Sequence, residues 1–131
     1  AKKMQDFGTY TGIAFQIKDD LFDYLSKNII GKPVGIDIKE QKMTLPLIFT
    51  LNSAKEIDRK YFFNIIKKQN NNQSKVKELI EFVKKSGGLD YAIGVVKDYQ
   101  QKAKDILAEF PDSEAKHSLN LMLDYVIERK F

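Results

Sequence analysis

Three carboxylates share one stripe of a predicted helix near the start of the chain. At about 100° per residue, four polar side chains fall within an arc of roughly 100°: Gln16, Asp19, Asp20 and Asp23. Carboxylates three or four residues apart destabilise a helix by about 0.2–0.5 kcal/mol per pair, so a counter-charge is expected over the stripe. Lys18 points away from it. Magnesium is usually held by one or two carboxylates together with substrate phosphates, and it suits this pattern.

An exposed acidic face without a ligand is the alternative, since short acidic clusters are common on helices. The segment that follows favours a ligand. Residues 26–44 form an expected loop broken by glycine and proline, with Lys32 and Lys42 on either side of Asp37. The next helix is expected to begin near Thr44. A glycine-bearing loop, two lysines and a helix N-terminus can bind a phosphate group, so the two segments together predict chemistry on a diphosphate.

Three motifs here resemble those of the trans-prenyltransferases, the polyprenyl diphosphate synthases. GIAFQIKDDLFD (residues 12–23) is similar to their second aspartate-rich motif, GKPVGID (31–37) to the loop after it, and KMTLP (42–46) to the following helix start. Their order and spacing match, and residues 111–131 resemble the family's C-terminal helix. The resemblance spans essentially the whole chain. It implies an all-α fold, the C-terminal part of the isoprenoid synthase helical bundle.

The resemblance implies a Mg²⁺-dependent condensation of isopentenyl diphosphate with an allylic diphosphate. In that family the allylic C–O bond ionises, the double bond of isopentenyl diphosphate attacks the carbocation, and a proton is lost. Matched motif by motif, Asp19 is implied as the principal magnesium ligand, with Asp20 and Asp23 as further ligands, directly or through water. Metal ions and lysines both stabilise negative charge on a departing diphosphate.

Substrate contacts are implied in the same way. Lys32 and Lys42 would bind the allylic diphosphate, and Gln16 would line the cavity near the reacting carbons. Asp37 would orient Lys32 or a water molecule. No residue is assigned as the catalytic base. His117, the single histidine, is expected at a solvated or core-edge position rather than in catalysis.

The chain also departs from the family pattern. Its 131 residues hold no second DDxxD motif and begin with Ala1. We therefore expect a single region, residues 1–131, that is the C-terminal portion of a longer synthase and inactive by itself. An apolar helix without its upstream partners would expose hydrophobic surface, so self-association, a homo-oligomer, is expected. The residues that set product length in this family would lie upstream.

Three other interpretations stay open. One is a non-catalytic subunit of a hetero-oligomeric prenyl synthase, although such subunits have usually lost aspartates from their motifs. Another is a terpene cyclase, which typically has an Asn/Ser/Glu triad in place of the second aspartate cluster. The last is an unrelated helical bundle without a ligand.

Helices are expected from end to end, because apolar residues recur at three- and four-residue spacing and never alternate over a long stretch. The carboxylate-bearing helix, over residues 10–25, has a broad apolar arc and a second one at Phe15 and Phe22. Later breaks are expected at Asn70–Asn72 and Gly87–Gly88, with Ser74 and either Asp112 or Ser113 as N-caps. The residues expected to be buried in the later helices are Ile57, Tyr61, Phe62, Ile65, Ile66, Val76, Leu79, Ile80, Val83, Leu89, Ala92, Val96, Tyr99, Ala103, Ile106, Phe110, Ala115, Leu119, Met122, Leu123 and Val126.

Composition excludes several classes of protein. With no cysteine and one histidine, the chain can form neither a disulfide framework nor a Cys- or His-rich metal site. The net charge of +4 comes from lysines scattered among acids, a pattern that does not indicate nucleic-acid binding. The longest apolar run is far shorter than the roughly 20 residues that cross a bilayer. A cytoplasmic protein is the resulting expectation.

Overall fold

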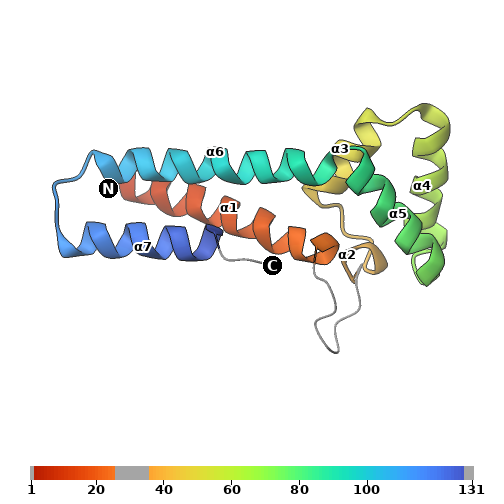
Figure 1. Ribbon diagram of the computed structural model, residues 1–131, viewed down its shortest axis with the longest axis horizontal. Helices are drawn as coiled ribbons and strands as arrows, with labels where there is room; N and C mark the ends of the chain where they lie inside the picture. Colours follow the sequence, from red (N-terminus) through yellow and green to blue (C-terminus); the bar gives the residue numbers. More distant parts are fainter. Residues whose placement is uncertain (1, 26–35, 129–131) are drawn as a thin grey trace. The chain divides into compact units, whose positions relative to one another are not determined.

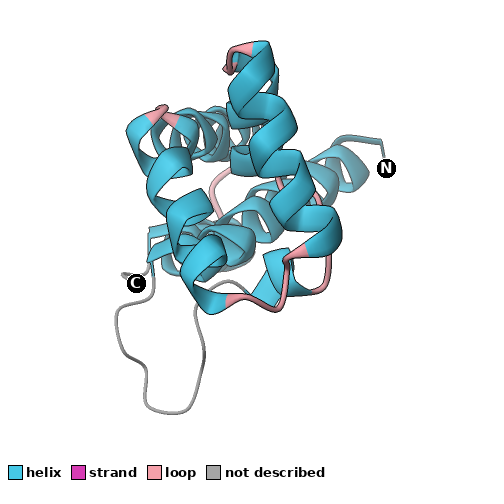
Figure 2. Ribbon diagram, turned by 90° about the vertical axis from the view of Figure 1, so that its right-hand side faces the viewer, coloured by secondary structure: helices cyan, strands magenta, loops and turns pink. Residues whose placement is uncertain are grey.

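The computed structural model describes residues 2–25 and 36–128, apart from the side chains of residues 22, 23, 25, 36, 37, 126 and 128. Within this part the helices are α1 Lys2–Leu25, α2 Ile36–Lys39, α3 Leu45–Ser53, α4 Glu56–Lys68, α5 Gln73–Lys85, α6 Gly88–Ala108 and α7 Glu114–Glu128 (Figure 1). Short loops connect the helices from α2 to α7, and no strand is drawn among the described residues (Figure 2). The all-α prediction is confirmed. No helix in the described ranges is long and apolar enough to span a membrane.

One helix was not expected. The predicted loop over residues 26–44 contains α2, a single turn in which Ile38 is fully buried. A four-residue helix is too short to show the 3.6-residue periodicity on which the prediction depended. Residues 26–35 of that loop lie outside the described part of the chain.

The helix ends follow mostly local rules. Thr44 precedes α3, as predicted, and Pro46 lies in the first turn of this helix. Ser113 caps α7 by accepting a hydrogen bond from the backbone N–H of Lys116 at 3.0 Å. The predicted cap of α5 is wrong by two residues: the side chain of Asn72, not Ser74, accepts from the N–H of Lys75. Asparagine is as good a cap as serine, so the residue type could not choose between them.

The chain folds into two compact units. The first comprises residues Ala1–Asp19 and Ile93–Phe131, and the second comprises Asp20–Ala92. Both boundaries fall inside helices, one in α1 and the other in α6.

The first unit joins parts of α1 and α6 to α7 through aromatic and polar contacts. Tyr10 of α1 lies 5.9 Å from Tyr99 of α6, ring centroid to ring centroid. Lys104 of α6 forms a 2.8 Å ion pair with Asp124 of α7, and Lys18 of α1 donates to the backbone carbonyl of Ile127. The side chains of this unit that are nearly inaccessible to solvent are Phe7, Ala14, Val96, Ala103, Leu107, Leu123 and Ile127.

The predicted buried face of α7 is wrong in part. Leu123 is fully buried as expected, but Ala115 and Met122 are exposed, and Ile127 is buried instead. Apolar side chains occur on several sides of this helix, with Leu121 and Tyr125 exposed as well. Periodicity therefore could not identify the side that packs against a neighbour.

The second unit is built around α3, α4 and α5, which pack against one another. Phe62 of α4 stacks on Phe82 of α5, with ring centroids 4.2 Å apart. The side chains of α3, α4 and α5 that form this core are Leu47, Leu51, Phe62, Ile65, Ile66, Val76, Leu79, Ile80 and Val83. Ile57 and Tyr61, which were expected in the core, are 77% and 39% exposed. Ile57 lies in the first turn of α4, and the hydroxyl of Tyr61 bonds to polar groups of α5.

Gly88, the first residue of α6, lies in a close contact with α3. A Cβ at this position would lie 2.8 Å from the backbone oxygen of Pro46 and 2.5 Å from Oγ1 of Thr50. That threonine hydroxyl already donates to the Pro46 oxygen at 2.8 Å. The backbone cannot move away cheaply, so only glycine fits.

The substitution Gly88→Ala is expected to destabilise the protein by about 1–3 kcal/mol, because it overpacks a rigid contact. The matched control is Gly94→Ala in the same helix, where an added Cβ meets no atom within 4 Å. Alanine should stabilise that exposed helical position by up to about 1 kcal/mol. Urea unfolding of both variants tests the contrast, and equal midpoints would contradict it.

Candidate functional site

The predicted carboxylate stripe lies on α1, and its members differ in burial. Asp19 is exposed, whereas only 9% of Asp20 is accessible to solvent. Gln16 is exposed one turn earlier. Asp23 belongs to the same helix, but its side chain is not among those described. The two described carboxylates are thus neighbours in the chain with different surroundings, one facing solvent and one facing the protein.

Lys42 provides a counter-charge for the buried carboxylate. Its Nζ lies 3.1 Å from Oδ1 of Asp20, and 46% of its side-chain surface is accessible to solvent. The sequence predicted a counter-charge for the stripe and, separately, a phosphate-binding role for Lys42, but it did not predict that this lysine contacts Asp20. A carboxylate and a partly exposed ammonium group are therefore brought together where the prediction put metal and diphosphate.

The backbone just before Lys42 is in an uncommon conformation. Gln41 has φ of 60°, in the left-handed region that residues other than glycine rarely adopt. Its N–H donates to the carbonyl of Ile38 at 2.9 Å, which closes the turn after α2. Its side-chain amide donates to the carbonyls of Ile66 and Lys67 at 3.3 and 3.2 Å, at the end of α4. These bonds attach the segment that leads into Lys42 to the core of the second unit.

A second attachment follows Lys42. The hydroxyls of Tyr24 on α1 and Thr44, the residue before α3, share a hydrogen bond of 2.8 Å, and both residues are 2% exposed. The sequence indicated Thr44 only as the start of a helix and gave Tyr24 no part in the site. No sequence signal indicated that the two would meet, because 20 residues separate them and the connection is tertiary.

The other predicted site residues are not placed by the described structure. Lys32 lies outside the described residues, and Asp37 lies on α2 with its side chain not described. Among the described side chains, no three His, Asp or Glu residues are close enough together to hold a metal ion. Asp19 and Asp20 offer the oxygen donors that a hard divalent cation prefers, so this donor set fits magnesium. His117 is exposed, as predicted.

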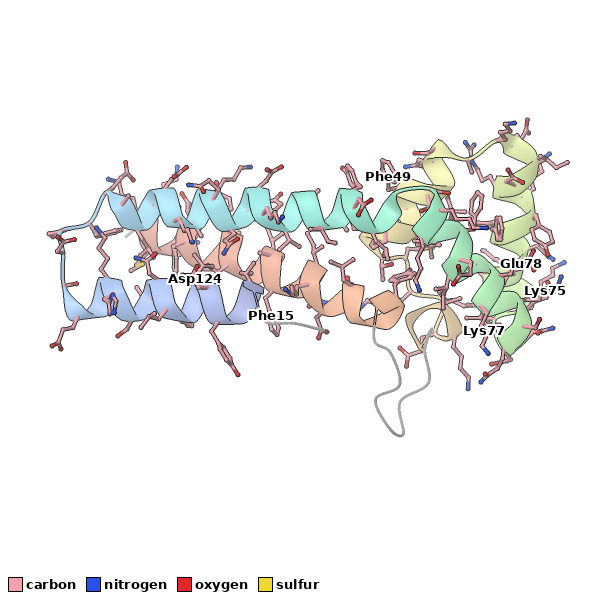
Figure 3. All side chains as sticks on the ribbon, in the orientation of Figure 1. Phe15, Phe49, Lys75, Lys77, Glu78 and Asp124 are labelled. Carbon is pink, nitrogen blue, oxygen red and sulfur yellow. The ribbon has the colours of Figure 1, made fainter. Side chains whose placement is uncertain are left out.

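A separate polar cluster, which the sequence did not indicate, lies on α4 and α5. The hydroxyl of Tyr61 donates to Glu78 at 2.8 Å and accepts from Lys75 at 2.9 Å. Figure 3 labels Lys75 and Glu78 on the side of α5 where α4 lies. The hydrogen bond to Tyr61 and the charge interaction with it raise the pKa of Lys75 above its ordinary value, and Glu78 adds to this effect. The cluster is exposed and joins two helices, so we interpret it as a surface contact between α4 and α5.

Comparisons of the sequence and of the structure with known proteins indicate the same family. A family model described as polyprenyl synthetase matches residues 1–83. A short chain isoprenyl diphosphate synthase from Methanothermobacter thermautotrophicus is 38% identical over 128 residues, which are 97% of this chain and 39% of that protein. The chain thus spans about two fifths of that relative's length.

Solved structures agree. The crystal structure of a geranylgeranyl pyrophosphate synthase from Bacteroides thetaiotaomicron matches with a TM-score of 0.88 and 39% identity, over 98% of this chain and 42% of that one. A polyprenyl synthase from Caulobacter crescentus, solved in complex with calcium and isoprenyl diphosphate, matches with a TM-score of 0.85 and 29% identity. That match covers 98% of this chain and 39% of the other.

The different surroundings of the two aspartates can be tested by matched substitutions. Asp20→Asn removes the charge that faces Lys42 and is expected to cost about 1 kcal/mol of stability, the upper end for a partly exposed ion pair. Asp19→Asn, at the exposed neighbouring position, is expected to stay within about 0.5 kcal/mol of the parent. Urea unfolding measures both, and a larger loss for Asp19→Asn would contradict the assignment.

Proposed function

This chain belongs to the polyprenyl synthetase family, and we propose that it provides the second aspartate-rich, diphosphate-binding part of a trans-prenyl chain-elongating synthase. The proposed reaction is the condensation of isopentenyl diphosphate with an allylic diphosphate, and the chain is proposed to be the C-terminal portion of that enzyme's single catalytic domain. Self-association and a cytoplasmic location are parts of the same proposal. Exposed Leu121 and Tyr125 on α7 support the first of these.

The single observation that carries the proposal is the contact of Asp20 with Lys42. Like-charged aspartates on one helix favour a bound cation, and a lysine beside them favours a bound anion. A cation and an anion side by side are what a metal–diphosphate complex presents. The Caulobacter crescentus polyprenyl synthase, solved in complex with calcium and isoprenyl diphosphate, supports the same pairing of ligands.

Each residue then has a proposed role. Asp19, Asp20 and Asp23 would hold Mg²⁺, which when bound neutralises charge on the diphosphate group. Lys42 would contact the diphosphate oxygens and stabilise the negative charge that develops as this group departs. Its side chain is half exposed and its amine lies 3.1 Å from Asp20, so it would need only a small movement to reach a ligand held there.

Three further residues complete the proposed site. Lys32 is proposed as a second diphosphate ligand, and Asp37 as a residue that orients Lys32 or a water molecule. Gln16, exposed on α1, would face the reacting carbons of the substrate.

Binding of Mg²⁺ with inorganic diphosphate should raise the thermal unfolding midpoint of this chain. A ligand at about 100 times its Kd adds about 2.7 kcal/mol, which corresponds to several degrees for a protein of this size. The variant Asp19→Ala/Asp20→Ala should lose the shift. The control variant Asp98→Ala/Asp105→Ala, which removes two exposed acids of α6, should keep it. If the parent melts cooperatively with no shift, this chain does not form the proposed site by itself.

The 131-residue chain alone is expected to show no prenyl elongation. Its sequence contains one DDxxD motif, whereas the proposed chemistry needs metal ions between two such motifs. Incubation with Mg²⁺, radiolabelled isopentenyl diphosphate and an allylic diphosphate, followed by product extraction, would check this. Extractable polyprenyl product above a no-protein control would refute the expectation.

A further inference from the structure

Two interactions connect the same two segments side by side. Asp20 and Tyr24 lie four residues apart on α1, and their partners Lys42 and Thr44 lie two residues apart in the stretch before α3. That stretch is extended at Thr44, with φ of −93° and ψ of 163°. The ion pair and the hydroxyl bond therefore run between the helix and the three-residue stretch 42–44, whose last residue is extended.

The spacing of the two interactions is matched. Residues four apart on an α-helix share a face and are separated by about 6 Å along its axis. Residues two apart in an extended segment also share a side and are separated by about 6.6 Å. One interaction therefore places the other in register. A slip of one residue would turn Lys42 to the opposite side of the segment, away from Asp20.

Of the two interactions, the hydroxyl bond is the better anchor. Tyr24 and Thr44 are both 2% exposed, so neither hydroxyl can easily exchange its partner for water. Lys42 is about half exposed, and a partly exposed ion pair is by itself a weak constraint. The turn at Gln41 fixes the segment on its other side through the carbonyls at the end of α4.

We propose that Tyr24 and Thr44 are positioning residues that hold Lys42 over Asp20. If the chain has the proposed function, the Tyr24–Thr44 bond places the Lys42 amine where a diphosphate would bind, and this part of the proposal rests on that function. The position of the amine itself does not depend on any ligand.

The first test measures the reactivity of the Lys42 amine in the whole chain without ligand. An amine-reactive reagent is applied in brief pulses to the folded protein, and labelling of Lys42 is followed by peptide mass spectrometry. Tyr24→Phe and Thr44→Val are expected to increase the labelling rate several-fold, as is Asp20→Asn, which removes the partner directly. Thr44→Ser, which retains the hydroxyl, should leave the labelling rate of Lys42 at the parent value.

The matched control is Tyr61→Phe, which removes a tyrosine hydroxyl bonded to Glu78 and Lys75 on the outer surface of α4 and α5. It should leave Lys42 labelling unchanged. Rates are compared below each variant's own unfolding midpoint, so a general loss of stability does not imitate the effect. Parent-like labelling of Lys42 in both Tyr24→Phe and Thr44→Val would overturn the proposal. So would fast labelling of the parent that Asp20→Asn does not change.

The second test separates this proposal from the proposed function. Calorimetric titration with inorganic diphosphate in the presence of Mg²⁺ should show several-fold weaker binding by Tyr24→Phe, and parent-like binding by Tyr61→Phe. If the parent binds no diphosphate, the proposed function of this chain fails, and the labelling experiment still decides the role of Tyr24 and Thr44. If the parent and Tyr24→Phe bind equally well, the positioning role is refuted.

Discussion

A carboxylate that is nearly buried on a helix requires a cation beside it. The position of the segment before α3 in the second unit follows from how this chain provides a cation for Asp20. The cation is Lys42, 22 residues along the chain, so the segment before α3 has to lie against α1. An ion pair of this kind is weak when half exposed. It persists because neighbouring contacts that are buried or made to backbone carbonyls hold the segment in place.

Those neighbouring contacts have a common chemical basis, which is the satisfaction of backbone and hydroxyl groups at helix ends. Gln41 donates to the last carbonyls of α4, and Asn70 donates to the carbonyl of Lys39 at 2.7 Å. Arg59 donates to carbonyls at the end of α3, with a distance of 2.9 Å to Leu51. Helix ends leave carbonyls without partners, and long polar side chains bind them. The described loops after α2, α3 and α4 are thereby fixed by polar contacts, while α3, α4 and α5 are held by apolar ones.

Local sequence rules predicted the elements better than their packing. The break at Gly87, with φ of 81°, and the start of α3 after Thr44 depend on a few adjacent residues, and both were predicted. The buried side of α7 depends on which neighbour it meets, and there Met122 was wrongly assigned to the core. Ile57 was misassigned for a similar reason: an apolar residue at the correct helical spacing is still exposed when no element covers that turn.

The candidate site likewise has features that the sequence predicted and others that only the packing decided. The carboxylates of α1, the lysines after it and their resemblance to a diphosphate-binding family could be read from the sequence, because charge type and spacing are local properties. The contact of Lys42 with Asp20 and the bond between Tyr24 and Thr44 were decided by the tertiary structure. Both join residues about 20 positions apart whose types are ordinary, and only the packing of the extended segment against α1 brings them within hydrogen-bond distance.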